Sequence, residues 1–201
     1  MESDTIPPKL LQYLDLLSPG SRYVLSFSPF FVNHFSVTLV SHLVSTLRKR
    51  VLYVCVGRPH IFVQKMLQNR SVPIRNIYFM DMVLGVARRP RPEKDEGLFF
   101  ADDGSSVDIP SIYKLFKVDQ EVDVLTLDEV DVVILDNVSE LRTYNNDDRV
   151  RSMLELLNEI WKRDARGIFL MHLNNRPNDG VKKISGELGF ETLEIPNDVF
   201  Q

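Results

Sequence analysis

The stretch that decides the fold runs from Gly20 to Val56 and reads GSRYVLSFSPFFVNHFSVTLVSHLVSTLRKRVLYVCV. It opens with an apolar run, Tyr23 to Phe27, and closes with a second one, Val51 to Val56. A helix predicted between them, from Ser36 to Arg50, carries an apolar stripe that suits packing on a sheet: Val37, Val40, Val44 and Leu47. The second run shows no alternation, which indicates burial on both faces and hence a parallel sheet. Strand, loop, helix and strand in this order predict a βαβ unit.

The loop of this unit, Ser28 to Phe35, lies where a nucleotide-binding α/β domain would hold phosphate. A phosphate-binding loop reads G-x-x-x-x-G-K-[ST]: its glycines let backbone amides surround the phosphate, its lysine adds charge and its hydroxyl holds Mg²⁺. Here Ser28 and Asn33 stand at the glycine positions, His34 at the lysine position and Phe35 at the hydroxyl position. The loop therefore has the expected place and length but none of the residues that bind phosphate.

Five short strings, taken in order and spacing, extend this pattern over most of the chain: GS at 20–21, VLYV at 51–54, NIYFMD at 76–81, VVILD at 132–136 and GIFL at 167–170. In this frame the sequence resembles the RecA/KaiC-like ATPase superfamily, especially its short archaeal single-domain members, from about Leu16 to Ile195. The resemblance implies an α/β fold of three αβα layers around a mostly parallel central sheet, the RecA-like P-loop NTPase fold.

The resemblance also assigns roles to residues that follow the later strands. The Walker B acid of the superfamily, which holds the water shell of Mg²⁺, matches Asp136 by position. Active members carry a glutamate after the second strand to polarise the attacking water, whereas this chain has Gly57 and Arg58 there. A polar residue that senses the γ-phosphate often follows the fifth strand, where this chain has His172. A different reading of Asp136 is an acid that caps the turn after its own strand.

The binding free energies expected at such a loop favour one that neither binds nor hydrolyses nucleotide. A micromolar site corresponds to about −8 kcal/mol, and a charge-assisted hydrogen bond to phosphate contributes roughly 1.5–3 kcal/mol. Loss of the lysine and the hydroxyl together therefore weakens affinity by on the order of a hundredfold or more. Phe30 and Phe31 resist the backbone angles that glycine adopts, and we expect their bulk to fill the phosphate space. We predict no enzyme activity, no cofactor and no metal site.

The first functional hypothesis is accordingly a non-catalytic RecA/KaiC-like domain, a pseudo-ATPase that serves as a structural or regulatory protein-interaction module. Phe30, Phe31 and Phe35 form either a self-filled core or an exposed apolar patch for a partner. The expected partner is a second copy of the chain or an active RecA/KaiC-like protein. A candidate partner surface combines two of these aromatic residues with a basic loop: Phe30, Phe31, Arg88, Arg89 and Arg91.

Two other hypotheses stay open. One is an ATP-binding or ATPase-related protein with an unorthodox phosphate loop, which would use Asp136, His172 and His34. The other is a DNA-associated, recombinase-like accessory protein that binds through the basic loop from Arg88 to Arg91, although the net charge of −4 argues against nucleic acid as the partner.

Composition limits the organisation of the chain. The 201 residues suit one α/β domain, 1–201, with an irregular, charged and proline-rich insertion at 83–108. The single cysteine, Cys55, lies in an apolar run and is expected to be a buried small hydrophobic residue. We find neither a signal peptide nor an apolar run long enough to span a membrane, so we expect a soluble cytoplasmic protein without membrane contacts.

The remaining elements are predicted from periodicity and turn residues. Between the second and fourth strands we expect a hairpin turn at Asp102–Gly104, a short helix at 109–116, and either a strand at 122–127 or a helix there. The other expected elements are the helices Ile6–Leu17, Pro59–Asn69, Asp147–Asp164 and Val181–Leu188, and the strands Asn76–Asp81, Val130–Asp136, Gly167–Met171 and, at the sheet edge, Phe190–Ile195.

Overall fold

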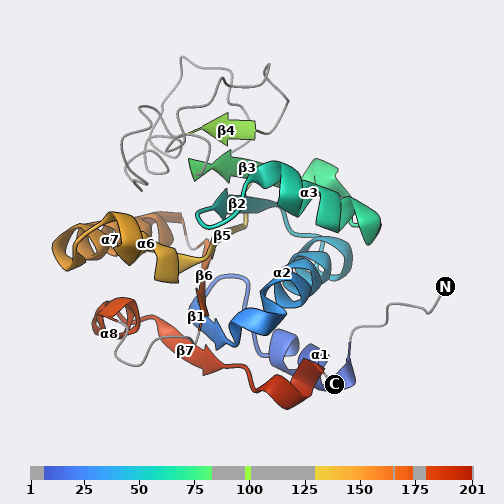
Figure 1. Cartoon of the computed structure of the whole chain (residues 1–201), viewed down its shortest axis with the longest axis horizontal. Coiled ribbons are helices and arrows are strands. Elements are labelled where there is room, and N and C mark those ends of the chain that lie inside the picture. Colours follow the sequence, from blue (N-terminus) through green and yellow to red (C-terminus); the bar gives the residue numbers. More distant parts are fainter. Residues whose placement is uncertain (1–6, 83–97, 101–129, 165, 174–179, 201) are drawn as a thin grey trace.

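The computed structural model describes residues 7–82, 98–100, 130–164, 166–173 and 180–200. Their strands form one sheet in the order β4-β3-β2-β5-β6-β1-β7, and every pair of neighbours is parallel (Figure 1). The strands are β1 (Arg22–Phe27), β2 (Val51–Cys55), β3 (Ile77–Asp81), β4 (Leu98–Phe100), β5 (Val132–Asp136), β6 (Gly167–Leu173) and β7 (Glu191–Glu194). The predicted parallel sheet is confirmed, with the last strand at its edge.

Helices cover both faces of this sheet, as Figure 1 shows. One face carries α1 (Pro8–Asp15), α2 (Val32–Ser41) and α3 (His60–Asn69), and the other carries α6 (Leu141–Tyr144), α7 (Asp147–Asp164) and α8 (Gly180–Glu187). Short helical turns complete the described chain: η1 (Pro29–Phe31), η2 (His42–Thr46), η3 (Ile74–Asn76), η5 (Val138–Glu140) and η6 (Asn197–Phe200). The expected three αβα layers are present.

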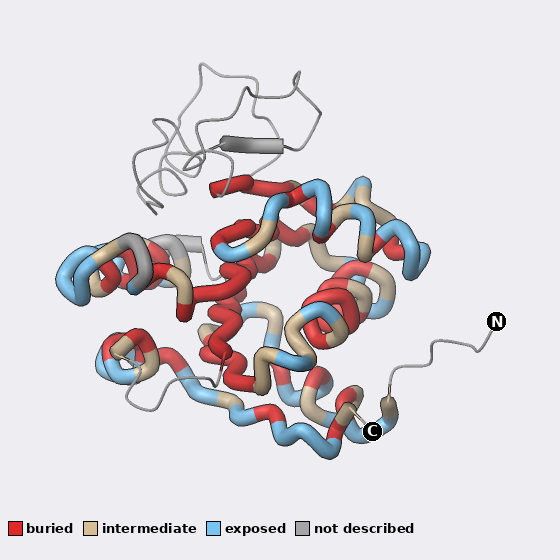
Figure 2. The backbone as a smooth tube through the Cα atoms, viewed as in Figure 1, coloured by how far each residue is buried: buried red, intermediate tan, exposed pale blue. Residues whose placement is uncertain are grey.

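Strand β2 explains why the sequence shows an unbroken apolar run at this point. Tyr53 and Cys55 belong to the apolar core beneath α1, α2 and α3, whereas Leu52 and Val54 belong to the core beneath α6, α7 and α8. Because successive side chains of a strand point to opposite faces, a strand covered on both sides needs apolar residues at every position. All of β2 is buried accordingly (Figure 2).

The segment after β1 differs from its prediction. We expected a loop up to Phe35 and a helix from Ser36 to Arg50, but the chain enters the turn η1 at Pro29 and continues directly into α2 at Val32. Proline favours the first turn of a helix, and no glycine in this segment supports an open loop. The helix also ends earlier, in the π-helical turn η2, and Arg48 follows with a positive φ of 58°.

Several predictions fall outside the described residues and stay predictions: the hairpin turn at Asp102–Gly104, the elements at 109–116 and 122–127, and the basic residues Arg88, Arg89 and Arg91. Of the insertion expected at 83–108, the structure describes β4, which pairs in parallel with β3. Within the described ranges, no helix is long and apolar enough to cross a membrane.

Candidate functional site

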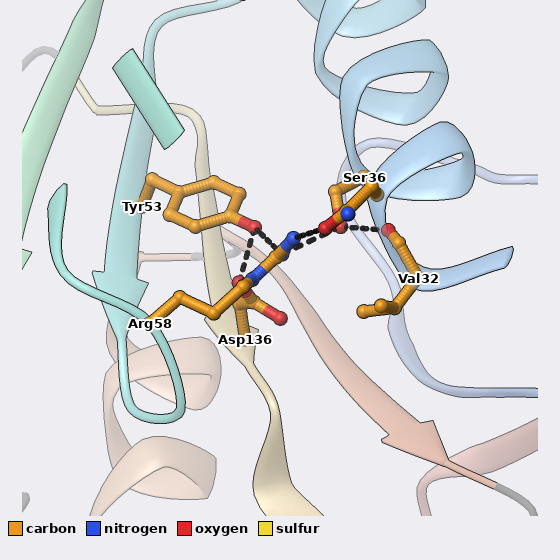
Figure 3. A network of polar contacts seen from close by, with 6 residues as sticks. Val32, Ser36, Tyr53, Arg58 and Asp136 are labelled. Atoms are coloured by element: carbon orange, nitrogen blue, oxygen red, sulfur yellow. Dashed lines mark hydrogen bonds and ion pairs between the residues drawn. The ribbon is translucent and has the colours of Figure 1, made fainter. Parts of the chain in front are cut away.

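Asp136, at the end of β5, is the centre of a buried polar network at the carboxyl edge of the sheet (Figure 3). Its Oδ2 atom accepts hydrogen bonds from the Tyr53 hydroxyl at 2.6 Å and from Arg58 Nε at 2.9 Å. Arg58 Nη2 also contacts the same oxygen. The side chain of Asp136 is fully buried and that of Arg58 is only 15% exposed, so this is a buried ion pair.

The guanidinium of Arg58 also reaches across to helix α2. Its Nη2 atom donates to Ser36 Oγ at 2.9 Å and lies 3.0 Å from the Tyr53 hydroxyl, and its Nη1 atom donates to Asn33 Oδ1. Ser36 in turn donates to the carbonyl oxygen of Val32 in the first turn of α2. We call the contacts of Arg58 with Asp136, Tyr53, Ser36 and Asn33 the Arg58 clasp.

The electrostatics of the clasp favour the charged pair. Burial raises the pKa of the Tyr53 hydroxyl well above its ordinary value, and the neighbouring carboxylate of Asp136 raises it further. Tyr53 therefore stays protonated and can donate to Asp136. Burial by itself lowers the pKa of Arg58, but Tyr53 and Asp136 raise it, and the net shift is upward. The guanidinium keeps its charge.

The backbone places Arg58 beside Asp136. Strands β2 and β5 are neighbours, and Cys55 pairs in register with Asp136. The carbonyl oxygen of Asp136 accepts from the amide of Val56 at 2.6 Å and from that of Gly57 at 3.2 Å. The link after β2 is thereby fixed to the end of β5, and the next residue is Arg58.

Two amides of the segment expected to hold phosphate are bonded within the chain. The amide of Phe31 donates to the carbonyl oxygen of Ser28 at 3.0 Å, and that of Val32 donates to the carbonyl oxygen of Pro29. Pro29 has no amide hydrogen to offer. A phosphate cradle needs several backbone N–H groups that point at the ligand, and the amides of Phe31 and Val32 are directed toward carbonyl groups of the chain instead.

The three phenylalanines of this segment lie in three different environments. Phe35 is fully buried, with its ring 4.5 Å from that of Phe27. Phe31 stacks on Phe200 of the turn η6 at 4.3 Å with an interplanar angle of 7°. Phe30 is 93% exposed. The expectation that Phe30 fills the phosphate space is therefore wrong, because the helical turn η1 directs its side chain into solvent.

The structure places two residues of the alternative nucleotide site, Asp136 and His172, on opposite faces of the sheet. Asp136 pairs in register with Met171, so the next residue, His172, faces the opposite side of the sheet. His172 is buried there, with Nδ1 at 3.4 Å from Ser26 Oγ. His34 lies on the α2 side, with its ring edge-on to Phe200 at 5.8 Å.

The turn after β5 is capped by Asn137 and not by Asp136, for which this role was the alternative reading. The Oδ1 atom of Asn137 accepts from the amide of Ser139 at 3.0 Å and caps the turn η5. Asp136 Oδ2 is instead the acceptor for Arg58 and Tyr53. Asn137 therefore caps the turn, and Asp136, whose side chain is buried, accepts the hydrogen bonds from Arg58 and Tyr53.

A second buried acid, Asp81, lies on the other side of β2. Its Oδ2 atom accepts from the backbone amide of His60 at 2.7 Å and is 2.6 Å from His60 Nδ1, at the start of α3.

Cys55 pairs in register with Asp81 and with Asp136. Burial raises the pKa of the Cys55 thiol well above its ordinary value, and the two carboxylates raise it further. Cys55 is buried, as predicted, and its thiol stays protonated.

The sequence prediction did not include Arg58 and Tyr53 among the site residues. In the sequence, Arg58 stands out only because a glutamate is absent at this point. The signal for its role is a cation placed after the strand that neighbours Asp136, at the edge where the carboxyl ends of parallel strands meet. Tyr53 carries no such signal, because a tyrosine in an apolar run is typical of a core position.

Comparisons with known proteins agree with this architecture. No protein-family model matches the chain, and no curated protein matches it. Among solved structures, the KaiC-like protein PH0186 from the hyperthermophilic archaeon Pyrococcus horikoshii OT3 superposes with a TM-score of 0.59 at 9% identity, over 92% of this chain and 76% of that protein. This chain has a RecA/KaiC-like fold. A second Pyrococcus horikoshii OT3 protein, PH0250, gives a TM-score of 0.54 at 10% identity, over 94% and 88% of the two chains. A third solved structure, an ATPase domain, gives 0.50 at 13% identity, over 92% and 72%.

The RecA/KaiC-like fold implies Mg²⁺ beside the acid that ends the fourth strand of the family, and the residues around Asp136 do not fit the ion. A metal bound by Asp136 would lie beside the Arg58 guanidinium, which already binds the same carboxylate. Two positive charges next to one buried carboxylate repel each other strongly. The second oxygen, Asp136 Oδ1, is buried and without a hydrogen-bond partner among the described residues. Mg²⁺ usually keeps several waters in an octahedral shell, and a single buried oxygen beside Arg58 offers it no such site.

Proposed function

We propose that this chain is a non-catalytic RecA/KaiC-like domain, a pseudo-ATPase that acts as a structural or regulatory protein-interaction module. The Arg58 clasp is the observation that carries this proposal. A side chain of the protein supplies the positive charge at Asp136 that Mg²⁺ supplies in an ATPase of this type. The site at the carboxyl edge is thereby filled from within the chain.

The start of α2 supports the same conclusion. The amides of Phe31 and Val32 are bonded within the turn, and Pro29 has none. At the position of the phosphate-loop hydroxyl, the ring of Phe35 is buried in the core. A triphosphate placed against this turn would meet amides that are already bonded and, in Arg58, a cation that is already paired.

Hydrolysis would also require a base, and the two acids that end β5 and β3, Asp136 and Asp81, are engaged. Arg58 follows β2 where a water-positioning glutamate is expected in active relatives. Asp81, at the end of the adjacent strand β3, is fully buried and bound to the backbone and ring of His60. Phosphoryl transfer depends on positioning and on electrostatic stabilisation, and these groups contribute to the stability of the fold instead.

Phe30 is the residue that we assign to partner binding. It is 93% exposed on a turn that leads directly into α2, and its neighbour Phe31 is stacked on Phe200. Aromatic side chains are enriched in the cores of protein interfaces. The partner is a second copy of the chain or an active RecA/KaiC-like protein. Arg88, Arg89 and Arg91, which lie outside the described residues, stay candidates for binding the same partner.

Replacing Phe30 with alanine should weaken association while leaving the fold intact. An exposed side chain contributes within about 0.5 kcal/mol to stability, whereas burial of a phenylalanine at an interface contributes about 1.5–3 kcal/mol. Association should therefore weaken by about tenfold or more. Light scattering over a concentration series measures self-association, and a photo-crosslinking amino acid at position 30 identifies another bound protein by mass spectrometry.

Leu47→Ala is the matched control. Leu47 is 36% exposed and precedes β2, so it lies at the amino ends of the strands, whereas Phe30 lies at their carboxyl ends. It should associate like the wild-type protein. A wild-type chain that stays monomeric and forms no crosslink through position 30 would contradict the interaction role. Equal effects of Phe30→Ala and Leu47→Ala on association would contradict it as well.

A further inference from the structure

We infer that Arg58 is the lock that holds the first turn of α2 against the sheet and thereby fixes the position of Phe30. In a phosphate-binding domain, a bound ligand can order such a segment and release it on hydrolysis. Here a residue of the chain takes this role, so the turn is held permanently. The inference rests on the proposed function only for the use that is made of Phe30.

The clasp has one arm on the sheet and one on the helix. The sheet arm joins Arg58 to Asp136 and Tyr53, and the helix arm joins it to Asn33 and Ser36. Figure 3 shows the guanidinium between the strand ends and α2. Because both arms belong to one planar group, movement of the first turn of α2 breaks contacts of a buried cation.

The start of α2 has no side-chain cap and no acid in its first turn. The N-cap residues of η1 and α2, Ser28 and Phe31, make no side-chain capping hydrogen bond. The first turn of α2 contains no acidic residue that would interact favourably with the helix dipole. A helix that begins without a cap or an acid tends to fray. The helix arm of Arg58 supplies a polar attachment to a turn that has neither a side-chain cap nor an acidic residue.

The lock extends to Phe30 through continuous helical structure. The turn η1 passes into α2 without a break, and Phe31 donates its amide to Ser28 within that turn. Asn33, which Arg58 holds, is less than one helical turn from Phe30. The stack of Phe31 on Phe200 holds the same segment from the other side. The backbone that carries the exposed Phe30 is therefore held in place, which lowers the backbone part of the entropy cost of binding through it.

Hydrogen exchange on the double variant Asn33→Ala/Ser36→Ala tests the lock. These changes remove the helix arm and leave Arg58 paired with Asp136 and Tyr53. Amides of residues 31–36 should exchange about tenfold faster or more, because bonds to a charged group no longer oppose local opening. Amides of β1 and β6 should keep their wild-type rates. Alanine has a higher helix propensity than serine or asparagine, so propensity alone would slow the exchange.

Ser152→Ala in α7 is the matched control. Ser152 Oγ donates to the carbonyl oxygen of Asp148, four residues earlier, just as Ser36 Oγ donates to that of Val32. Among the described residues, no arginine is seen to donate to Ser152 Oγ, whereas Arg58 donates to Ser36 Oγ. Its local amides should exchange less than about threefold faster. The single variant Asn33→Ala, at an exposed position, should show a smaller acceleration confined to the same segment.

Unchanged exchange at residues 31–36 in the double variant would overturn the inference. Equal acceleration in β1 and β6 would also overturn it, because the helix arm would then stabilise the whole fold rather than this turn. The outcome is independent of nucleotide binding. Saturable ATP binding would contradict the proposed function and leave the exchange result standing, whereas unchanged exchange would remove the lock alone.

Discussion

Replacing Arg58 with methionine should lower the free energy of unfolding by about 3–5 kcal/mol, because Asp136 would remain buried without its counter-ion. Asp136 is fully buried, and the Tyr53 hydroxyl alone would continue to donate to its Oδ2 atom. Methionine retains the apolar stem of the side chain, so the loss reports on the charge rather than on packing. Urea unfolding followed by circular dichroism measures this difference.

Two further variants separate the buried pair from a general effect of losing an arginine. Arg142→Met removes a surface ion pair, with Arg142 Nε at 2.7 Å from Asp147 Oδ1, and should cost about 0–1 kcal/mol. Arg58→Met/Asp136→Leu removes both buried charges and should recover most of the loss. If Arg58→Met were no more destabilising than Arg142→Met, the clasp would not be the structural core of the site.

Replacing Phe35 with alanine should destabilise the protein by about 3–5 kcal/mol. Phe35 is fully buried, and its ring lies 4.5 Å from that of Phe27 and 6.2 Å from that of Phe200. Truncation would leave a cavity between the sheet and the turn η6. The same unfolding experiment measures the loss, and the m-value should stay unchanged if the native state remains compact.

Phe30→Ala is the comparison for this experiment, since it removes the same side chain from a position that is 93% exposed. It should change stability by about 0.5 kcal/mol or less. A Phe35→Ala variant within about 1 kcal/mol of wild type would show that the core tolerates a small residue here. The same cost should apply to Phe35→Thr, which introduces a hydroxyl at this position, because a small polar side chain would replace a ring of the core.

The fold follows from the sequence because its signals are local. Unbroken apolar runs predicted β2, β5 and β6, and the apolar stripe from Val150 to Trp161 predicted α7 over its full length. A parallel sheet buries both faces of its inner strands, so these runs carry the topology as well as the strand positions. The start of α2 was misplaced because the comparison with a glycine-rich loop outweighed the local preference of Pro29 for a helical turn.

The site was less predictable because its contacts depend on strand order and register. Asp136 was identified from its position after an apolar strand. Its partners come from β2 and from the link that follows it, and only the pairing of β2 with β5 brings them together. The separation of His172 from Asp136 likewise follows from one step of register. A shift of one residue reverses the face of a side chain, and the sequence does not specify that shift.

The most direct test of the pseudo-ATPase proposal is isothermal titration of the wild-type protein with Mg²⁺-ATP. The Arg58 clasp, the internally bonded amides of Phe31 and Val32 and the buried ring of Phe35 predict no saturable heat up to a nucleotide concentration of about 1 mM. A saturable isotherm with a dissociation constant in the micromolar range, weakened by Asp136→Ala in a variant that remains folded, would contradict the proposal.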